Sequence, residues 1–488
     1  MFIGIDIGTT ATKAILIDDA QTIIASGSHT YEYTSRIAGY AEQHPQIWID
    51  AVQSCLAQIR EKNSRALATA KRIGLSGQMH SLVALDNMHK PIKAAMLWND
   101  ARGQAEADLL ATQIPDIEEI SGAAAMPSFS ACKFLWMRNH ERGLFDKIRH
   151  IALPKDMVRL WLTGELATDH SDAAGTQLYD QRQRNWSDAI CGVIGIESSA
   201  LPTIYESHEG AGRVRSEVAS TLGLPTNCEV VIGGADTAAG ALGLGVVIPG
   251  DSFITLGTSA IVATITNGYH PTSKGFLHNF AHCLPNQYYR MGAMLNGASA
   301  LAWAARLVGA DDIGQLLHAV EARFTGPSRV MFIPYLNGER TPHNNADLRG
   351  ALLGLDSASD KFDIAQAVIE GVSLCLKDAL LVLGLDANTI GAMGFIGGGA
   401  RSPFWTKILA SVLNVPLVKY EGADLWPALG AARLAMLASN IDQLNDIAKK
   451  PRIENMVRPE TPLVNAYFER HRVYQNVQHV SFDFAKLK

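Results

Sequence analysis

Short apolar segments that end in glycine turns alternate along this chain with segments whose apolar residues recur every three or four positions. Residues 2–7, 12–17 and 23–30 have the first pattern and predict three consecutive strands. Residues 46–60 have the second pattern and predict a helix with one apolar stripe, formed by Trp48, Val52, Cys55, Leu56 and Ile59. Further strands are expected at residues 72–75, 229–233, 252–256, 330–333 and 394–396, and further helices at 364–383, 404–413 and 428–438. This mixture predicts an α/β protein.

Two of the expected strands lead into similar turns. Residues 3–7 run into Gly8-Thr9-Thr10, and residues 254–256 run into Gly257-Thr258-Ser259. Residues 5–18 align with residues 254–267 without a gap, and the identical pairs are Ile5/Ile254, Gly8/Gly257, Thr9/Thr258, Ala11/Ala260 and Ala14/Ala263. A glycine turn with hydroxyls and free backbone N–H groups can hold phosphate. The repeat therefore predicts two related lobes with a nucleotide between them.

Length and composition fit a globular protein of two or three domains. The chain has 488 residues, 47% of them apolar and 18% charged, with a net charge of −6. Without a long run of lysine or arginine, a nucleic-acid or anionic-membrane partner is not expected. The first strand contains Asp6, so no secretory segment is expected, and the apolar stretches 230–249 and 292–310 are interpreted as packed interior. The expected location is the cytoplasm.

Cysteine spacing argues against structural zinc and against a disulfide framework. No two cysteines form a Cys-x-x-Cys pair or group with histidines. Buried thiols in a reducing compartment are expected instead. The cysteines are Cys55, Cys132, Cys191, Cys228, Cys283 and Cys375.

Two aspartates follow or end apolar strands, and each allows two interpretations. Asp6 could hydrogen-bond local backbone N–H groups, or it could lie near a nucleotide-bound Mg²⁺. Asp236 could cap a helix that begins there, or it could act as a catalytic base. The glycine run at residues 397–399 permits either a tight turn or backbone contact with a ligand. The chain has no Gly-x-x-x-x-Gly-Lys-Ser/Thr motif, which excludes a P-loop nucleotide site.

Over its whole length the chain resembles the FGGY carbohydrate kinases. Residues 128–140 (Ser-x-Ser-x-x-Lys-Phe-x-Trp-Met-x-Asn-His) resemble a signature of that family. The turns at residues 8–10 and 257–259 resemble its two phosphate motifs, and residues 397–401 resemble its adenosine motif. Other ordered matches are residues 97–100, 153–156, 171–176 and 338–345. The resemblance implies two actin-like (ribonuclease H-like) lobes around a cleft, with a boundary near residues 240–250. The expected domains are residues 1–242 and 243–488.

The resemblance also implies an activity and a set of site residues. The expected reaction is transfer of a phosphoryl group from ATP, with Mg²⁺, to the 5-hydroxyl of D-xylulose, with Asp236 as the general base. Metal contacts are expected from Asp6 and Asp236. The expected sugar contacts are Gln78, Met79, His80, Trp98, Asn99, Asp236 and Thr237. The expected nucleotide contacts are Gly8, Thr9, Thr10, Gly257, Thr258, Ser259, Gly297, Gly398, Gly399 and Arg401.

One departure from the family pattern concerns the sugar. Thr237 stands after the catalytic aspartate where members that act on D-xylulose often have an amide, which bonds with two groups at once. Ribulose, a deoxy-pentulose or another polyol therefore stays an alternative substrate. An actin-like ATPase without sugar transfer, or a catalytically silent sugar sensor, are alternatives from other classes. A homodimer is the assembly that the resemblance suggests.

Several other polar residues are interpreted as structural. Lys133 and Trp136 are expected to belong to the packed interior, and Asp156 and Asp172 to hold loops. Glu339 and Arg340 are expected to form an ion pair that braces a lobe. Glu106 and Asp108 are expected on a solvated helix face.

Overall fold

The three N-terminal strands form the antiparallel meander that their pattern predicts, and β1 lies in the middle of a seven-stranded sheet. The computed structural model describes residues 1–271 and 274–486. The order of the first sheet is β13-β14-β5-β1-β2-β3, with β15 also beside β5. Its strands are β1 (Phe2–Ile7), β2 (Ala11–Ile17), β3 (Ile23–Thr30), β5 (Arg72–Gly77), β13 (Gly210–Arg213), β14 (Glu229–Val231) and β15 (Gly234–Ala235).

A second seven-stranded sheet repeats this plan, and its order is β18-β19-β17-β16-β22-β23-β24. β16 is antiparallel to β17 and parallel to β22, just as β1 is antiparallel to β2 and parallel to β5. The strands are β16 (Ser252–Leu256), β17 (Ala260–Thr266), β18 (His278–Ala281), β19 (Tyr288–Met294), β22 (Met393–Ile396), β23 (Leu417–Tyr420) and β24 (Ile453–Val457). The prediction of an α/β fold with two related lobes is confirmed.

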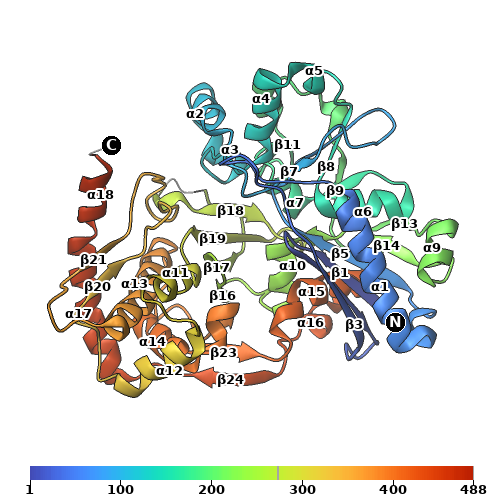
Figure 1. Cartoon of the computed structure of the whole chain (residues 1–488). Helices are drawn as coiled ribbons and strands as arrows, with labels where there is room; N and C mark the ends of the chain where they lie inside the picture. Colours follow the sequence, from blue (N-terminus) through green and yellow to red (C-terminus); the bar gives the residue numbers. More distant parts are fainter. Residues whose placement is uncertain (272–273, 487–488) are drawn as a thin grey trace.

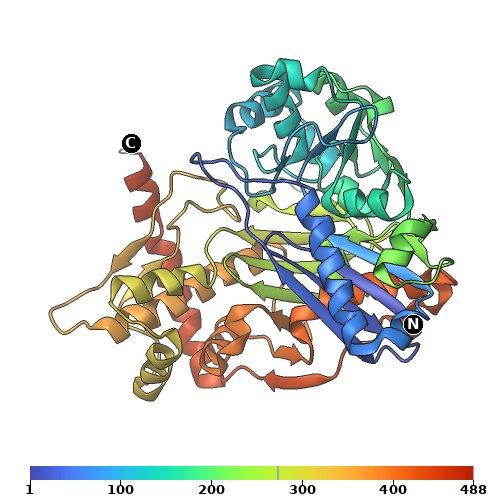
Figure 2. The same cartoon turned by 45° about the vertical axis from the view of Figure 1, so that its right-hand side comes forward.

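Helices cover the faces of the first sheet, and one of them comes from the far half of the chain. α1 (Gln46–Leu67) covers β2 and β3, and α15 (Trp426–Leu437) packs on β1 and β5 (Figure 2). A Cβ at Gly4 would lie 1.8 Å from the carbonyl oxygen of Ala428, and one at Gly74 would lie 1.7 Å from that of Ala431. The missing side chains let the helix backbone reach the sheet. α10 (Asp236–Leu244) packs in turn on α15.

The second lobe is built around a long helix. α13 (Lys361–Val382) packs on β17 and β19 and forms much of one hydrophobic core with its neighbours. The capping box at its start, in which Asp360 and Asp363 each accept a backbone N–H of the other residue, fixes where it begins. The neighbouring elements are α11 (Ser299–Leu307), α12 (Ile313–Arg323), β20 (Met331–Ile333), β21 (Ala351–Leu353), α14 (Pro403–Leu413), α16 (Leu444–Ile447), α17 (Thr461–Val477) and α18 (His479–Ala485).

Most of residues 80–205 form a further layer that stands over one end of the first sheet (Figure 1). This layer has a core of its own, which includes Phe134, Leu135 and Trp136. Its strands are β4 (Glu42–Gln43), β6 (Val83–Leu85), β7 (Ala95–Met96), β8 (His150–Ala152), β9 (Ala167–Asp169), β10 (Tyr179–Asp180), β11 (Asn185–Trp186) and β12 (Thr203–Tyr205). Its helices are α2 (Gln104–Gln113), α3 (Ile117–Ser121), α4 (Ser130–His140), α5 (Arg142–Phe145), α7 (His170–Ala174) and α8 (Asp188–Ile194). α6 (Pro154–Thr163) packs on the first sheet and shares its core, and α9 (Ser216–Leu222) lies beside α1.

The expected elements are present, with some shifted ends. α1 continues past Arg60 to Leu67, and the strand expected at residues 229–233 divides into β14 and β15. Gly233, at φ 85°, interrupts the ladder between the two strands. The six cysteines are free and buried. Among the described residues, no helix is both long and apolar enough to cross a membrane.

Candidate active site

The two glycine turns project from corresponding hairpins of the two sheets. In the first turn, the N–H of Gly8 donates to the carbonyl of Ala11 at 3.0 Å. In the second, the N–H of Gly257 donates to the carbonyl of Ser259 at 2.9 Å. The residues that carry the hydroxyls of the turns are each at least partly exposed: Thr9, Thr10, Thr258 and Ser259. Both turns therefore offer hydroxyls and N–H groups to the space between the lobes.

Neighbouring side chains hold the first turn in place. The indole N–H of Trp98 donates to Thr9 Oγ1 at 2.8 Å, and Thr9 Oγ1 donates to Gln78 Oε1 at 3.2 Å. Tyr31 donates its phenolic O–H to the carbonyl of Gly8 at 2.7 Å. Gln78 is buried, so its amide contacts this turn from the protein interior rather than facing open space.

Gly297 holds the second turn. Its N–H donates to the carbonyl of Thr258 at 2.9 Å, and the N–H of Ala298 donates to the carbonyl of Gly257 at 2.7 Å. A Cβ at Gly297 would lie 2.4 Å from the carbonyl oxygen of Ser259. Gly297 is thus a packing residue of this turn, and any larger residue would displace the turn.

The two aspartates lie close to each other beside the first turn. Asp6, in β1, accepts a hydrogen bond from Ser76 Oγ at 3.1 Å, and burial raises its pKa to about 6. Asp236 is the first residue of α10, and its Oδ1 accepts the N–H of Thr237 at 2.6 Å and the O–H of Thr237 at 3.2 Å. Burial, and secondly the charge of Asp6, raise the pKa of Asp236 to about 7. Within the described ranges, neither aspartate forms an ion pair.

A cavity of about 170 Å³ opens at Asp236. The expected site residues that line it are Met79, His80, Trp98, Asp236, Thr237 and Ser259. A neighbouring cavity of about 650 Å³ holds the phosphate turns, and its expected residues are Thr9, Thr10, Trp98, Asn99, Thr258 and Ser259. The structure therefore brings the expected sugar residues and the expected phosphate turns together.

His80 is fixed by residues of the 128–140 motif. It has φ 64°, and its carbonyl accepts Lys133 Nζ at 2.7 Å and Ser130 Oγ at 3.1 Å. Its ring nitrogen Nδ1 bonds to the carbonyl of Gly175. Burial lowers the pKa of His80 to about 3, so the ring is neutral at physiological pH. Lys133 and Trp136 are buried, as expected. Lys133 holds the loop of residues 77–80, which we call the sugar loop because Gln78, Met79 and His80 are expected sugar contacts.

Three of the expected nucleotide residues lie apart from both cavities. Gly398, Gly399 and Arg401 form a short 3₁₀ turn after β22, and none of them lines either cavity. Arg401 forms an exposed ion pair with Asp424 at 3.4 Å.

Two structural interpretations from the sequence are wrong. Glu339 and Arg340 do not form an ion pair, because the Glu339 carboxylate accepts the backbone N–H groups of Leu295 at 2.7 Å and of Arg340 at 2.8 Å. Glu106 is not on a solvated face: it is buried and accepts from Asn139 and His140, while Asp108 is exposed as expected. Sequence spacing could not show that both glutamates accept hydrogen bonds from residues far away in the chain.

Residues from the second lobe were missed. His278, in β18, and Arg340 both line the smaller cavity. His278 is buried, and neither of its ring nitrogens has a partner within the described residues. The available signal was two histidines, His278 in β18 and His282 just after it, because residues four apart in an extended segment share a face.

Beside Asp236 lies a group of buried charges that we call the Lys155 cluster: Lys155, Asp156, Arg159, Asp169 and Asp172. Lys155 Nζ lies 2.6 Å from Asp156, 3.0 Å from Asp169 and 3.4 Å from Asp172. The cluster is linked to β15, because Ser171 accepts the N–H of Ala235 at 2.9 Å and donates to Asp169. It also braces the sugar loop, since a Cβ at Gly77 would lie 3.1 Å from Lys155. Asp156 lies in α6 and contacts Lys155 and Arg159 of the same helix, whereas Asp172 lies in α7 and accepts no hydrogen bond from the described residues.

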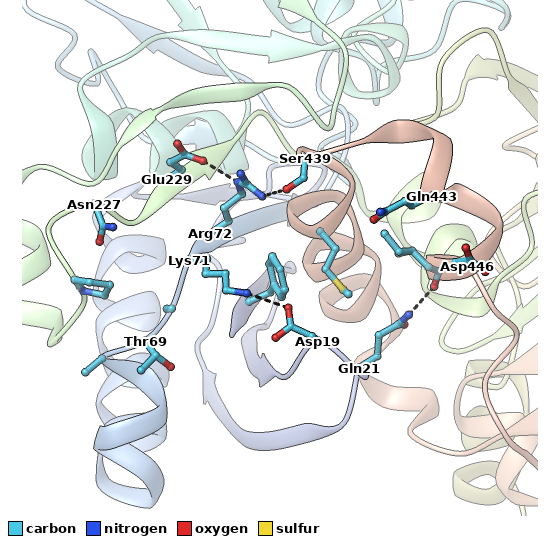
Figure 3. Close-up of a pocket in the computed structure, with 16 residues that line it drawn as sticks. Asp19, Gln21, Thr69, Lys71, Arg72, Asn227, Glu229, Ser439, Gln443 and Asp446 are labelled. Atoms are coloured by element: carbon cyan, nitrogen blue, oxygen red, sulfur yellow. Dashed lines mark hydrogen bonds and ion pairs between the residues drawn. The ribbon is translucent and has the colours of Figure 1, made fainter.

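A larger cavity of about 860 Å³ lies at the opposite ends of β1 and β5 (Figure 3). Four of its charged groups are paired, Lys71 with Asp19 at 3.0 Å and Arg72 with Glu229 at 2.7 Å, whereas Asp446 forms no ion pair with the described residues. Arg72 also donates to Ser439, and Gln21 donates to the carbonyl of Ile447 at 2.9 Å. The two ion pairs lie within the first lobe, and the two hydrogen bonds join that lobe to the region around α16. The glycine turns near Asp236 do not line this cavity.

Two similar lobes, each with a glycine turn at the same cleft, fit the class of two-lobed sugar kinases. The models of the N-terminal and C-terminal domains of the FGGY family of carbohydrate kinases match residues 1–243 and 252–439. The chain belongs to the FGGY family of carbohydrate kinases.

Relatives and solved structures agree with this family over nearly the whole chain. The chain is 36% identical to the xylulose kinase of Escherichia coli (strain K12), with 98% of both chains covered. It superposes on a kinase structure from Brucella ovis with a TM-score of 0.93 and 36% identity, covering 98% of both chains. It also superposes on a gluconate kinase from Lactobacillus acidophilus with a TM-score of 0.92 and 26% identity, covering 100% of this chain and 99% of the other.

Proposed function

We propose that this chain transfers the γ-phosphoryl group of ATP to the 5-hydroxyl of D-xylulose, giving D-xylulose 5-phosphate and ADP. The observation that carries the proposal is the position of Asp236, which lines the same small cavity as the sugar loop and the second phosphate turn. The E. coli relative is named for xylulose. In this proposal residues 1–242 bind the sugar and provide the base, and residues 243–488 bind most of the nucleotide.

Asp236 is the general base of the proposed reaction. Thr237 donates both of its hydrogen bonds to Oδ1, so Oδ2 is the oxygen that takes the proton of the attacking hydroxyl. The raised pKa of Asp236, caused mainly by burial, makes the carboxylate a better proton acceptor than an ordinary aspartate.

The two turns bind the phosphates of ATP in this proposal. The cavity of about 650 Å³ is lined by Thr9, Thr10, Thr258 and Ser259. These residues offer hydroxyl and backbone donors to phosphoryl oxygens. Donors that are already in place stabilise charge in the transition state without reorganising. Adenosine is proposed to lie toward Gly398, Gly399 and Arg401, outside the two cavities.

Asp6 and Asp236 fit an ATP-bound Mg²⁺. Mg²⁺ prefers oxygen ligands and is usually held by one or two carboxylates together with substrate phosphates. The described residues contain no group of three or more His, Cys, Asp or Glu side chains able to hold an ion by themselves. Two carboxylates close together with raised pKa values are suited to a cation that arrives with the nucleotide. When bound, Mg²⁺ would neutralise phosphate charge.

The sugar is proposed to contact Met79, His80, Trp98 and Asn99. Asn99 Oδ1 is buried without a partner within the described residues, so an acceptor is free for a sugar hydroxyl. His278 adds two free ring nitrogens from the second lobe. Buried polar groups of this kind discriminate among sugars, because a substrate that leaves them unpaired binds poorly.

A panel of acceptors tests the proposal. ADP release with Mg-ATP would be measured with D-xylulose, D-ribulose, L-ribulose, glycerol, D-gluconate and no acceptor, and the product mass would be determined. We expect D-xylulose to give the highest kcat/KM and a singly phosphorylated product. A preference for D-ribulose or D-gluconate would keep the kinase and reject the substrate, whereas turnover that ignores every acceptor would reject sugar phosphorylation.

A further inference from the structure

Arg340 lies where the two cavities of the cleft meet. It follows β20 in the long segment before β21, and it lines both the cavity of about 170 Å³ and the cavity of about 650 Å³. Asp236 lines only the first of these, and the turn residues Thr9 and Thr258 line only the second. The guanidinium therefore lies between the proposed sugar and the proposed phosphates of ATP.

The charge of Glu339 acts on this guanidinium from nearby, but no ion pair joins the two side chains. The side chain of Arg340 forms no hydrogen bond or ion pair with residues 1–271 or 274–486. The adjacent carboxylate, Glu339, is used by the backbone N–H groups of Leu295 and Arg340, and burial raises the pKa of Glu339 to about 7. Asp236 shares a cavity with Arg340 but forms no ion pair with it, so a group can fit between them.

An unpaired arginine in a partly buried site is costly unless a ligand supplies negative charge. The charge of Arg340 acts on His278, which lines the same cavity of about 170 Å³. Burial is the main cause of the lowered pKa of His278, and the charge of Arg340 lowers it further. Neutral sugar hydroxyls do not balance a full positive charge. A phosphoryl group does, and the planar guanidinium matches its oxygens with paired N–H donors.

We propose that Arg340 is a catalytic residue that contacts the phosphoryl group as it passes from ATP to the sugar. This inference rests on the proposed function. The sugar oxygen forms a bond to the γ-phosphorus, the bond from that phosphorus to the bridging oxygen of ADP breaks, and ADP leaves with the electron pair. The proton of the sugar hydroxyl goes to Asp236. Arg340 donates to non-bridging oxygens of the transferred group and stabilises their charge.

The effect of such a contact is large in other phosphoryl transfers, where an arginine that reaches the transferred group accelerates the reaction by roughly 10³- to 10⁵-fold. For Arg340→Ala we expect kcat with D-xylulose to fall by about 10³-fold. The dissociation constant of D-xylulose, measured by tryptophan fluorescence, should change less than about threefold. Added guanidinium ion should restore part of kcat in Arg340→Ala. A purely structural role would not produce that rescue.

The matched control is Arg329→Ala in the same lobe, because Arg329 forms an exposed ion pair with Asp356 at 2.9 Å and lines neither cavity. Its kcat should stay within about twofold of the parent and should not respond to guanidinium. Arg340→Lys, which keeps the charge without the planar fork, should retain the fold and fall between the parent and Arg340→Ala. If kcat of Arg340→Ala stays within tenfold of the parent, or if D-xylulose affinity falls as much as kcat/KM, the proposal is overturned.

A second measurement separates this proposal from the proposed function, because it needs no turnover. Tetrafluoroaluminate mimics a phosphoryl group in transfer when it binds beside ADP and Mg²⁺. In thermal-shift titrations, ADP alone should stabilise the parent and Arg340→Ala equally. Tetrafluoroaluminate should add stabilisation only in the parent, whichever acceptor the enzyme uses. Equal added stabilisation in both proteins would overturn the role of Arg340 even in an enzyme whose acceptor is not D-xylulose.

Discussion

Two groups of carboxylates lie near the short strand β15, and they differ in which charges face them. On the cleft side, Asp6 and Asp236 have no cation within ion-pair distance among the described residues, and burial raises the pKa of both. In the interior, Asp156, Asp169 and Lys155 form direct ion pairs with no exposed surface.

The difference shows how the same residue type acquires different tasks. In the Lys155 cluster, Lys155 forms ion pairs with all three carboxylates and Arg159 pairs with Asp156. Ser171 links this cluster to β15, because it accepts the N–H of Ala235 and donates to Asp169. The cleft carboxylates are left without a protein cation, which makes them available to a proton, a metal ion or a substrate hydroxyl. Burial alone therefore does not identify a reactive carboxylate, whereas burial without a cation beside a cavity does.

The largest expected effect comes from replacing the base. Asp236→Asn should lower kcat by about 10³-fold or more, because the amide cannot accept the proton of the sugar hydroxyl. The pKa of Asp236 is raised in the folded protein, so its contribution to stability is present below pH 4 and lost as pH rises through about 7. The variant should therefore unfold at the same or a higher temperature than the parent at pH 8.

Steady-state kinetics and thermal unfolding of the same preparations check both parts of this prediction. Asp188→Asn serves as the control, because Asp188 is exposed at the start of α8 and lines neither cavity of the cleft. A variant that is inactive and also strongly destabilised would mean that Asp236 belongs to the structural group of carboxylates.

Removing the cation of the Lys155 cluster tests whether this cluster stabilises the fold. Lys155→Met leaves buried carboxylates without their partner, a change that typically costs about 3–5 kcal/mol. Lys71→Met is the control, because its ion pair with Asp19 is exposed and such pairs contribute about 1 kcal/mol or less. Urea unfolding of both variants gives the difference, and equal midpoints would contradict the role assigned to Lys155.

Asp172 makes the stability of the Lys155 cluster depend on pH. Burial raises its pKa well above the usual value, Lys155 opposes that rise and Asp156 adds to it. Because the folded protein binds this proton more tightly than the unfolded chain, stability from the group is present at low pH and lost as pH rises through the raised pKa. Asp172→Asn should remove this loss, which grows by about 1.4 kcal/mol for each pH unit that separates the pKa of the folded protein from that of the unfolded chain.

Urea unfolding at pH 4, 6 and 8 tests this prediction. The stability of Asp172→Asn relative to the parent should increase from pH 4 to pH 8. A difference between the two proteins that does not change with pH would show that Asp172 is ionised in the folded protein throughout.

The smallest expected effect concerns the partner of the base. Thr237→Val removes the hydroxyl that donates to Asp236 Oδ1 at 3.2 Å and keeps the backbone N–H at 2.6 Å. We expect kcat/KM to fall up to about tenfold, because one hydrogen bond contributes about 1 kcal/mol. Thr221→Val, on the exposed end of α9, should leave kcat/KM unchanged. A loss as large as that of Asp236→Asn would make the hydroxyl a reacting group.

Local features of the fold could be predicted from sequence because short-range chemistry determines them. A buried strand followed by a glycine turn specifies both hairpins, and Asp236 begins a helix as its neighbours indicate. The short strands between residues 80 and 205 could not be predicted. β9 (Ala167–Asp169), for example, pairs only with β12 (Thr203–Tyr205), so it depends on a contact across the fold rather than on its own pattern.

The same limit explains the errors at the site. Arg340 was expected to pair with its neighbour, but Glu339 is occupied by the N–H of Leu295, which lies 44 residues earlier in the chain. His278 became visible only when β18 was placed against the sugar loop, where its ring lies 6.4 Å from that of His80. Contacts between residues far apart in the chain decide which charges stay unpaired. A single sequence does not show those contacts.

The most direct test of the central claim follows the γ-phosphoryl group itself. ATP labelled at the γ-phosphate would be mixed with D-xylulose and an excess of enzyme, and the label in sugar phosphate would be separated from that in inorganic phosphate over time. The account predicts rapid transfer of the label to the sugar by the parent, and a rate at least about 10³-fold lower for Asp236→Asn. Label that reaches inorganic phosphate at the same rate with or without sugar, or a variant as fast as the parent, would contradict Asp236 as the base of a sugar kinase.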